Sequence, residues 1–229
     1  MKTLIVGFGQ IGKALYQVLN EIYHVDVDDV IDTVHPERQD FDIMHICFPY
    51  YDTFICDVKQ YQEKYNPTYT VIHSTVALGT SRLCNAIHSP CIGLHPNLAE
   101  SLLTFTKFLG GEDACYVADY FRKSGMKVYL FDKQETTEAL KIMSTTFYAV
   151  LIEYTKQVKQ HCDDLGFDFS AWTLWTDNYN QGYNELGRFE YIRPNLVPMM
   201  KKLGGHCILP NCELLTDDFT KLIQERNRE

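Results

Sequence analysis

Cys207 is the residue of this 229-residue chain whose surroundings most favour nucleophilic chemistry. It follows Gly204 and Gly205, which give the backbone freedom to present the thiol in a cleft. A thiol acts as a nucleophile when it is accessible and its pKa is lowered, and a nearby lysine or helix terminus can lower it. A plain buried cysteine is the alternative. His206, Cys207 and Cys212 have no recognised metal-ligand spacing, so we expect no metal.

Lys141 is the second candidate for chemistry. It lies early in a long helical pattern, and Ser144, Thr145 and Tyr148 fall on its face because residues three and four apart are helix neighbours. Buried polar groups need partners, and a substrate with hydroxyl groups would supply them. The alternative is a lysine that extends into solvent from the first turns of the helix, paired with Glu138.

His95 is the third candidate. It follows the apolar run 90–94 and precedes Pro96, so we expect it at the end of a strand. An imidazole with a pKa of about 6.5 could act there as a general base toward a substrate hydroxyl. A strand-end histidine that is hydrogen-bonded to backbone explains the pattern equally well.

The element that would position a cofactor opens the chain. The apolar run 4–6 predicts a buried strand, and Gly7, Gly9 and Gly12 form G-x-G-x-x-G directly before an amphipathic helical pattern. Such glycines allow a tight turn, a close backbone approach to a pyrophosphate, and close packing of helix on strand. A glycine-rich turn that only packs strand on helix is the alternative. The expected dinucleotide-binding residues here are Gly7, Phe8, Gly9, Gln10, Ile11 and Gly12.

An acidic residue at the end of the second strand would hold the ribose hydroxyls of a dinucleotide. Asp28 fits this position best, and Asp26 is the near alternative. Asp29 adds negative charge that would repel a 2′-phosphate, so NAD is favoured over NADP. A solvated acidic turn would explain the same residues.

The first half of the chain alternates strand and helix patterns. Strands are expected near 4–6, 24–28, 41–48, 70–73, 90–94, 107–111 and 127–131, with helices near 11–22, 52–65, 82–87 and 113–123. This alternation predicts an α/β fold, a Rossmann-type doubly wound parallel sheet covered on both faces. Ligands bind such sheets at the carboxyl ends of the strands. We therefore expect Phe48, Pro49, Ser74 and Thr75 to contact the cofactor.

The pattern changes after Asp132. Residues 135–164 contain no Gly or Pro and predict one long helix, whose middle is apolar nearly all round and is expected to be buried. Those apolar residues are Ile142, Met143, Phe147, Ala149, Val150, Leu151 and Ile152. We predict an NAD-binding domain of residues 1–132 and a smaller all-helical domain of residues 133–229 with this helix at its centre.

Composition narrows the function further. The net charge of −9 argues against nucleic acid and anionic membranes as partners, since both attract basic patches. No leader pattern opens the chain, and no run approaches the ~18 apolar residues of a spanning helix. We therefore expect a cytoplasmic protein whose eight cysteines are mostly free thiols.

Four segments together resemble the nucleotide-sugar dehydrogenases of the UDP-glucose and GDP-mannose type, within the 6-phosphogluconate dehydrogenase-like superfamily. They are Val6–Gly12, Ser74–Thr80, Glu138–Lys141 and Gly204–Cys207, in the family's order and approximate spacing. That family oxidises a primary alcohol to a carboxylate in two hydride transfers to NAD. The resemblance implies that Cys207 carries a thioester, Lys141 stabilises an oxyanion, and Thr75 lies near the reacting carbon.

The sequence also departs from that family. The family's Asn one turn after the lysine is Thr145 here, and its Asp four residues after the cysteine is Asn211. The sequence contains no counterpart of the family's large C-terminal nucleotide-binding domain, so we expect a smaller substrate or a partner chain that completes the site. The pair His95-Pro96 resembles prephenate and arogenate dehydrogenases, in which such a histidine contacts the substrate hydroxyl.

Three functions remain open from the sequence. The first is oxidation of an alcohol of a sugar or sugar-nucleotide; the second is a one-step dehydrogenase of a hydroxy acid that uses His95 or Lys141; the third is a non-catalytic NAD(H)-binding sensor or scaffold. The partner in the first two is a small molecule. The resemblance also implies a homodimer, because the long helix is the usual dimer element of the superfamily.

Overall fold

The computed structural model describes residues 1–31, 35–37, 40–93, 96–199, 201–203 and 208–228. The chain forms two compact units, Met1–Ile142 and Met143–Glu229, and the boundary falls inside the helix α6 (Gln134–Leu165). The predicted division into domains of residues 1–132 and 133–229 stays a prediction.

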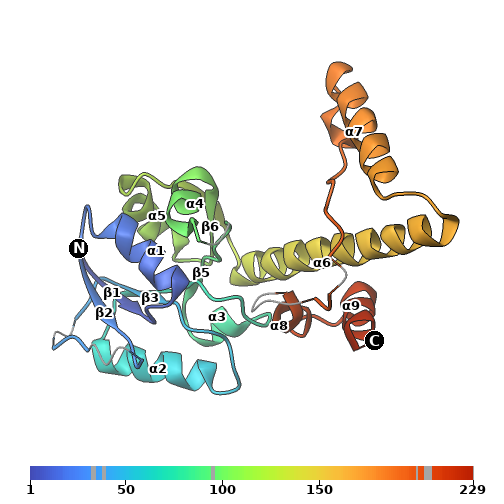
Figure 1. Ribbon diagram of the computed structural model, residues 1–229. Helices are drawn as coiled ribbons and strands as arrows, with labels where there is room; N and C mark the ends of the chain where they lie inside the picture. Colours follow the sequence, from blue (N-terminus) through green and yellow to red (C-terminus); the bar gives the residue numbers. More distant parts are fainter. Residues whose placement is uncertain (32–34, 38–39, 94–95, 200, 204–207, 229) are drawn as a thin grey trace. The chain divides into compact units, whose positions relative to one another are not determined.

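The first unit is built on a seven-stranded sheet in the order β2-β1-β3-β4-β5-β6-β7 (Figure 1). Its strands are β1 (Lys2–Val6), β2 (His24–Asp28), β3 (Ile43–Ile46), β4 (Tyr69–Ile72), β5 (Ile87–His88), β6 (Thr106–Gly110) and β7 (Lys127–Phe131). The first five strands run parallel, whereas β6 pairs antiparallel with β5 and parallel with β7. The predicted Rossmann-type α/β fold is therefore confirmed, with a sheet that is mostly, not wholly, parallel.

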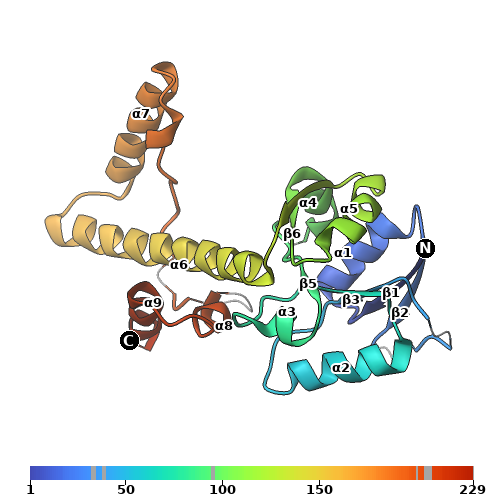
Figure 2. The same cartoon turned by 180° about the vertical axis from the view of Figure 1, so that it is seen from behind.

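Helices cover both faces of this sheet (Figures 1 and 2). The helices α1 (Gln10–Leu19), α4 (Leu98–Thr104) and α5 (Ala114–Lys123) pack on one face, and α2 (Phe54–Tyr65) packs on the other. Successive side chains of a strand point to opposite faces, so Ile5 joins the first core and Leu4 the second. Both faces are apolar because both are covered, as in other parallel sheets.

The fifth strand lies earlier in the chain than the sequence pattern predicted. Strand was expected at 90–94, but β5 is Ile87–His88, and the last pairing bond joins the Ser89 N–H to the Ile72 carbonyl at 2.8 Å. Pro90 has no N–H with which to continue the pairing. The helix expected at 82–87 is correspondingly shorter and earlier, α3 (Thr80–Leu83), and α4 had not been predicted.

The long helix α6 is confirmed, and its 32 residues span about 48 Å at ~1.5 Å per residue. The prediction that its apolar middle is buried is wrong in part. Ile142, Ala149 and Ile152 are at most 4% exposed, but Met143 is 53% and Phe147 is 62% exposed. The hydrophobic pattern runs round the helix, whereas the chain itself covers only some of its faces.

The regular secondary structure of the second unit, in its described residues, is helical. Besides α6 they are α7 (Ser170–Glu185), the 3₁₀ helix η1 (Phe189–Tyr191), α8 (Ile208–Cys212) and α9 (Asp218–Arg228). Figures 1 and 2 both show α8 and α9 beside α6, and their contact is a small apolar core. That core contains Ala149, Ile152, Leu203, Cys212 and Ile223.

A row of polar side chains crosses the core of the first unit on the face that α5 covers. His45 Nδ1 lies 2.9 Å from His73 Nε2, and His45 Nε2 lies 3.0 Å from the Tyr120 hydroxyl. The Tyr120 hydroxyl in turn lies 3.2 Å from the Thr3 hydroxyl. All four side chains are at most 2% exposed. Buried polar groups are tolerated when each has a partner, and this chain of hydrogen bonds supplies the partners.

Burial keeps these imidazoles neutral. It lowers the pKa of His45 to about 3, with a further contribution from the positive charge of Lys107. The pKa of His73 is lowered well below its usual value by burial first and by Lys107 second. Burial likewise lowers the pKa of His88 to about 4. The unfolded chain therefore binds more protons than the folded chain at mildly acidic pH.

We predict that His45→Gln makes the protein less sensitive to acid. The folded pKa of His45 lies below the unfolded value, so its contribution is complete above pH ~6.5 and is lost as pH falls toward the folded pKa, at about 1.4 kcal/mol per pH unit. Urea unfolding between neutral and mildly acidic pH measures how the free energy of unfolding changes with pH. This change should be smaller in the variant by the contribution of one histidine. Equal slopes for His45→Gln and wild type would contradict the prediction.

Candidate cofactor site

Two glycines shape the loop between β1 and α1. Gly7 has φ +91°, and a Cβ there would lie 2.9 Å from the Phe48 backbone nitrogen. A Cβ on Gly12 would lie 2.1 Å from the Gly7 carbonyl oxygen. Real Cβ atoms do not approach backbone this closely, so only glycine lets α1 begin against the end of β1.

Gly9 has a different environment. A Cβ on Gly9 would meet nothing within 4 Å, so this glycine faces open space. Helix α1 begins immediately after it, and among the described residues no side chain caps this terminus by a hydrogen bond. The first turn of α1 also contains no acidic residue. Free N–H groups and the helix dipole attract anions, so the loop fits the pyrophosphate of a dinucleotide.

The carboxylate of Asp28 contacts other side chains of the protein. Asp28 is 1% exposed, and its carboxylate accepts a hydrogen bond from the Tyr65 hydroxyl. It also lies 3.1 Å from Lys64 Nζ and 2.9 Å from His35 Nδ1. Burial, and then the hydrogen bond to Asp28, raises the pKa of Tyr65 to about 12, so the phenol stays a donor. Asp28 therefore ties the end of β2 to α2.

Asp29 is the carboxylate that reaches the glycine loop. Its Oδ2 accepts a hydrogen bond from the Phe8 backbone N–H at 2.5 Å. Asp26, the other acidic residue of this segment, lies 3.1 Å from the His24 imidazole instead. Sequence spacing could not predict which of the three acidic residues contacts the glycine loop. Their contacts depend on the tertiary structure around the end of β2.

The loops after β3 and β4 join the same edge of the sheet. The strands β1, β3 and β4 are parallel neighbours, so their carboxyl ends lie side by side. The Ser74 hydroxyl donates a hydrogen bond to the Phe48 carbonyl at 2.5 Å. Pro49 is exposed and Thr75 is half-buried beside them. The structure thus brings Gly7, Phe48 and Ser74 to one edge, where the sequence pattern had predicted a cofactor.

The first turns of α6 are fastened to the first unit by a buried carboxylate. Glu138 is 0% exposed, and its oxygens accept hydrogen bonds from the backbone N–H groups of Gly79 at 2.6 Å and Ser81 at 2.8 Å. One turn later, Lys141 Nζ donates to the Cys91 carbonyl at 2.8 Å. Glu138 had been considered only as a possible partner of Lys141, and its role at the start of α3 was missed.

His88 is a second residue that the sequence reasoning missed. It is 0% exposed, and its Nε2 lies 3.1 Å from the Ser74 carbonyl while its Nδ1 lies 2.8 Å from the Thr137 hydroxyl. His88 therefore connects the loop after β4 to α6, one turn before Lys141. The residues around His88 form no recognised motif, so the sequence did not predict this bridge.

Thr145 and Asn211 meet in the second unit. The Asn211 side-chain amide lies 3.4 Å from the Thr145 hydroxyl, and Asn211 is 6% exposed. The neighbouring Thr146 hydroxyl lies 3.8 Å from Cys212 Sγ. Burial raises the pKa of Cys212, so this thiol is inert. The two positions at which the sequence departs from the resembled family are thus in contact.

His95, His206 and Cys207 lie outside the described residues, and their predicted roles stay predictions. Within the described residues, no group of three or more His, Cys, Asp or Glu side chains could hold a metal ion. In the same part of the chain, no helix is both long and apolar enough to cross a membrane.

No protein-family model matches this chain. No curated protein sequence matches it either. Solved structures do match it. UDP-D-ManNAc dehydrogenase from Pyrococcus horikoshii has a TM-score of 0.72 at 16% identity, covering 100% of this chain and 68% of the other. UDP-glucose dehydrogenase from Pyrobaculum islandicum has a TM-score of 0.70 at 14% identity, covering 99% and 68%.

A shorter enzyme matches along nearly its whole length. 3-Hydroxyisobutyrate dehydrogenase from Mycobacterium tuberculosis has a TM-score of 0.74 at 14% identity, covering 99% of this chain and 92% of the other. At these identities the likeness establishes a shared fold. The chain therefore has the fold found in sugar-nucleotide and hydroxy-acid dehydrogenases.

We predict opposite effects of the same substitution at two glycines. Gly9→Ala places a methyl group in open space, so the unfolding temperature should stay unchanged while the Kd for NAD rises at least tenfold, or about 1.4 kcal/mol. Gly12→Ala forces a methyl group onto backbone, and overpacking of this kind costs about 1–3 kcal/mol of stability. Calorimetric NAD titration and thermal unfolding of both variants measure these effects. Wild-type NAD affinity in Gly9→Ala would show that the loop does not bind the phosphates.

Proposed function

We propose that the protein is an NAD-dependent dehydrogenase that oxidises an alcohol group of a sugar or sugar-nucleotide. The observation that carries this proposal is the glycine loop. Gly9 faces open space at the uncapped start of α1, where the carboxyl ends of three parallel strands meet. The sugar-nucleotide dehydrogenases that share the fold support it.

The cofactor would lie along the residues at this sheet edge. They are Gly7, Phe8, Gly9, Gln10, Ile11, Gly12, Phe48, Pro49, Ser74 and Thr75. We assign the ribose hydroxyls to the pair Asp28 and Asp29 at the end of β2. Asp29 contacts the loop through the Phe8 N–H, and both carboxylates already accept hydrogen bonds from protein groups. A carboxylate accepts hydrogen bonds from hydroxyls and repels a 2′-phosphate, which favours NAD over NADP. NAD, when bound, supplies the hydride acceptor.

Lys141 would stabilise the reacting oxygen of the substrate. Its ammonium is held by the Cys91 carbonyl at 2.8 Å, so it is pre-oriented. A preorganised cation stabilises negative charge that develops as an alcohol loses its proton. Thr75, after β4, would supply a hydroxyl near the reacting carbon.

Cys207 would carry the reaction on to the acid. Its thiolate would add to the aldehyde, and loss of a second hydride from that adduct would leave a thioester that water hydrolyses. Asn211 and Thr145, which contact each other, occupy the positions of the resembled family's Asp and Asn. Neither side chain is a carboxylate, so hydrolysis would need a different base.

A one-step hydroxy-acid dehydrogenase is the second candidate. One observation favours it: 3-hydroxyisobutyrate dehydrogenase is covered over 92% of its length, against 68% for UDP-D-ManNAc dehydrogenase. In this candidate His95 or Lys141 would be the acid–base group, and Cys207 would be structural. The two candidates differ in the number of NADH molecules formed per substrate.

We also propose a homodimer that uses the second unit. Large apolar side chains of α6 and α7 are exposed, and contiguous apolar surface marks interaction sites. Met143 and Phe147 on α6 are 53% and 62% exposed, and Leu174 and Trp175 on α7 are 72% and 70% exposed. A cytoplasmic location remains part of the proposal.

We predict that Lys141→Met removes turnover without removing cofactor binding. A panel of nucleotide sugars, free sugars and hydroxy acids, read by NADH absorbance, first identifies the substrate. Loss of the ammonium should then lower kcat by about 10²–10³-fold, the range for removal of one oxyanion donor. The Kd for NAD should stay within about twofold, since Lys141 is not a cofactor ligand. The exposed control Lys133→Met should behave as wild type, and a Lys141→Met enzyme with wild-type kcat would contradict the role.

We predict that Cys207→Ser stops oxidation at the aldehyde. A serine hydroxyl is a weaker nucleophile and forms no thioester, so each substrate should yield one NADH and no acid. Product analysis by mass spectrometry together with NADH counting measures this. Unchanged acid production would exclude Cys207 from the mechanism. One NADH per substrate in the wild type, with a ketone or aldehyde as product, would favour the hydroxy-acid candidate.

A further inference from the structure

The imidazole of His88 links the two segments that carry Thr75 and Lys141. Its Nε2 lies 3.1 Å from the carbonyl oxygen of Ser74, the residue directly before Thr75. Its Nδ1 lies 2.8 Å from the Thr137 hydroxyl. Lys141 follows Thr137 by four residues, so the two side chains lie on the same face of α6. One ring therefore contacts both the peptide before Thr75 and the helix turn before Lys141.

The segment that begins with His88 contacts α6 at two successive turns. The second contact joins the Cys91 carbonyl to Lys141 Nζ at 2.8 Å. Thr137 is also packed closely against β6, because a Cβ on Gly110 would lie 2.6 Å from the Thr137 hydroxyl oxygen. Thr137 is 1% exposed and His88 is 0% exposed. Close-packed interior side chains keep one rotamer, so this link between the segments has a fixed geometry.

A single tautomer satisfies both contacts of His88. The Ser74 carbonyl can only accept a hydrogen bond, so Nε2 carries the hydrogen and donates it. Burial lowers the pKa of His88 to about 4, so the ring is neutral and Nδ1 carries no hydrogen. The Thr137 hydroxyl therefore donates to Nδ1. The Gln134 carbonyl, 2.9 Å from the same hydroxyl, already accepts the backbone N–H four residues later in α6.

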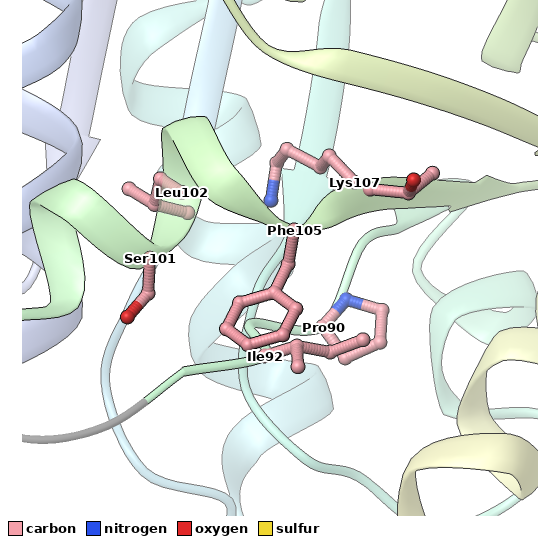
Figure 3. A pocket seen from close by; sticks show the side chains of 7 residues that line it. Pro90, Ile92, Ser101, Leu102, Phe105 and Lys107 are labelled. Carbon is pink, nitrogen blue, oxygen red and sulfur yellow. The ribbon is translucent and has the colours of Figure 1, made fainter. Parts of the chain in front are cut away.

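Two positive charges near His88 oppose its protonation. After burial, Lys107 on β6 and Lys141 on α6 both lower the pKa of His88. Lys107 lines a cavity together with Pro90 and Phe105, as Figure 3 shows. The volume of this cavity is about 10 Å³, which is room for about one water molecule and not for a substrate. Lys107 therefore acts on His88 through its charge, and Lys141 remains the lysine proposed to meet the substrate.

We propose that His88, as its Nε2–H tautomer, is a positioning residue that fixes where Thr75 and Lys141 lie relative to each other. The role rests on the proposed dehydrogenase function, in which these two side chains meet the substrate. His88 itself transfers no proton and stays neutral throughout. A misplacement of about 1 Å can slow a reaction ~10²-fold, so the two hydrogen bonds of this ring should control the rate of turnover without contributing to the chemistry.

The first test replaces Thr137. Thr137→Val removes the hydroxyl that donates to His88 Nδ1, keeps the size of the side chain, and leaves the contact of His88 with Ser74 in place. With the substrate found in the panel, kcat should fall by about ten- to a hundredfold. The Kd for NAD should stay within about twofold, because Thr137 is not a proposed cofactor ligand. Thr137→Ser retains the hydroxyl and should restore most of the lost kcat.

Thr3→Val is the matched control. Thr3 is 0% exposed, and its hydroxyl lies 3.2 Å from the Tyr120 hydroxyl, so this variant also removes a buried hydrogen bond from the first unit. It should lose stability in urea but keep the wild-type kcat. Wild-type kcat in Thr137→Val, a Thr137→Ser enzyme as slow as Thr137→Val, or an equal loss of kcat in Thr3→Val would overturn the positioning role. A wild-type protein that reduces NAD with no substrate of the panel would instead refute the proposed function.

The second test needs no activity assay. Nitrogen-15 NMR of the imidazoles reports which ring nitrogen carries the proton. In the wild type, the His88 proton should be on Nε2, and Nδ1 should show the shift of an acceptor that receives a hydrogen bond. In Thr137→Val the proton should stay on Nε2, while the Nδ1 resonance should move because its donor is gone. A proton on Nδ1 in the wild type, or an unchanged Nδ1 resonance in the variant, would overturn the link even in an active enzyme.

Discussion

The close approach of α1 to the end of β1 is the constraint on which the candidate site depends. The absent Cβ of Gly12 leaves room for the Gly7 carbonyl, which a methyl group would meet at 2.1 Å. This contact places the first N–H groups of α1 at the carboxyl edge of the sheet. Asp29 then fixes the loop from the other side through the Phe8 N–H. The helix start that we propose for the pyrophosphate is thus positioned by backbone packing, and Asp29 is the charged side chain that contacts it.

A second set of contacts fixes the start of α6 on that edge. The buried Glu138 carboxylate satisfies two backbone N–H groups at α3, and His88 joins the Ser74 carbonyl to the Thr137 hydroxyl. Removing one partner of a buried hydrogen-bonded charge leaves an uncompensated group, which is costly. Lys141 follows one turn later on the same helix. Its position relative to the loop after β4 therefore depends on groups that perform no chemistry themselves.

The sequence predicted those parts of the fold that local pattern controls. The glycine motif, the alternation of strand and helix, and the long helix follow from turn geometry and periodicity. The antiparallel pairing of β5 with β6 does not, because strand direction is a long-range property. Periodicity also cannot tell whether an apolar helix face is covered by its own chain, so the exposure of Met143 and Phe147 was not predicted. The contact of Asp28 with Tyr65 and that of Asp29 with Phe8 depend on tertiary structure that no sequence spacing encodes.

Amide NMR of the purified protein during a titration with NAD tests the central claim most directly. If the opening loop binds the pyrophosphate, saturable shifts should appear first at the backbone amides of Gly9, Gln10 and Ile11, at the start of α1. The amides of the exposed end of α2 should not move. An absence of shifts at the loop up to millimolar NAD, or shifts confined to other segments, would contradict the account.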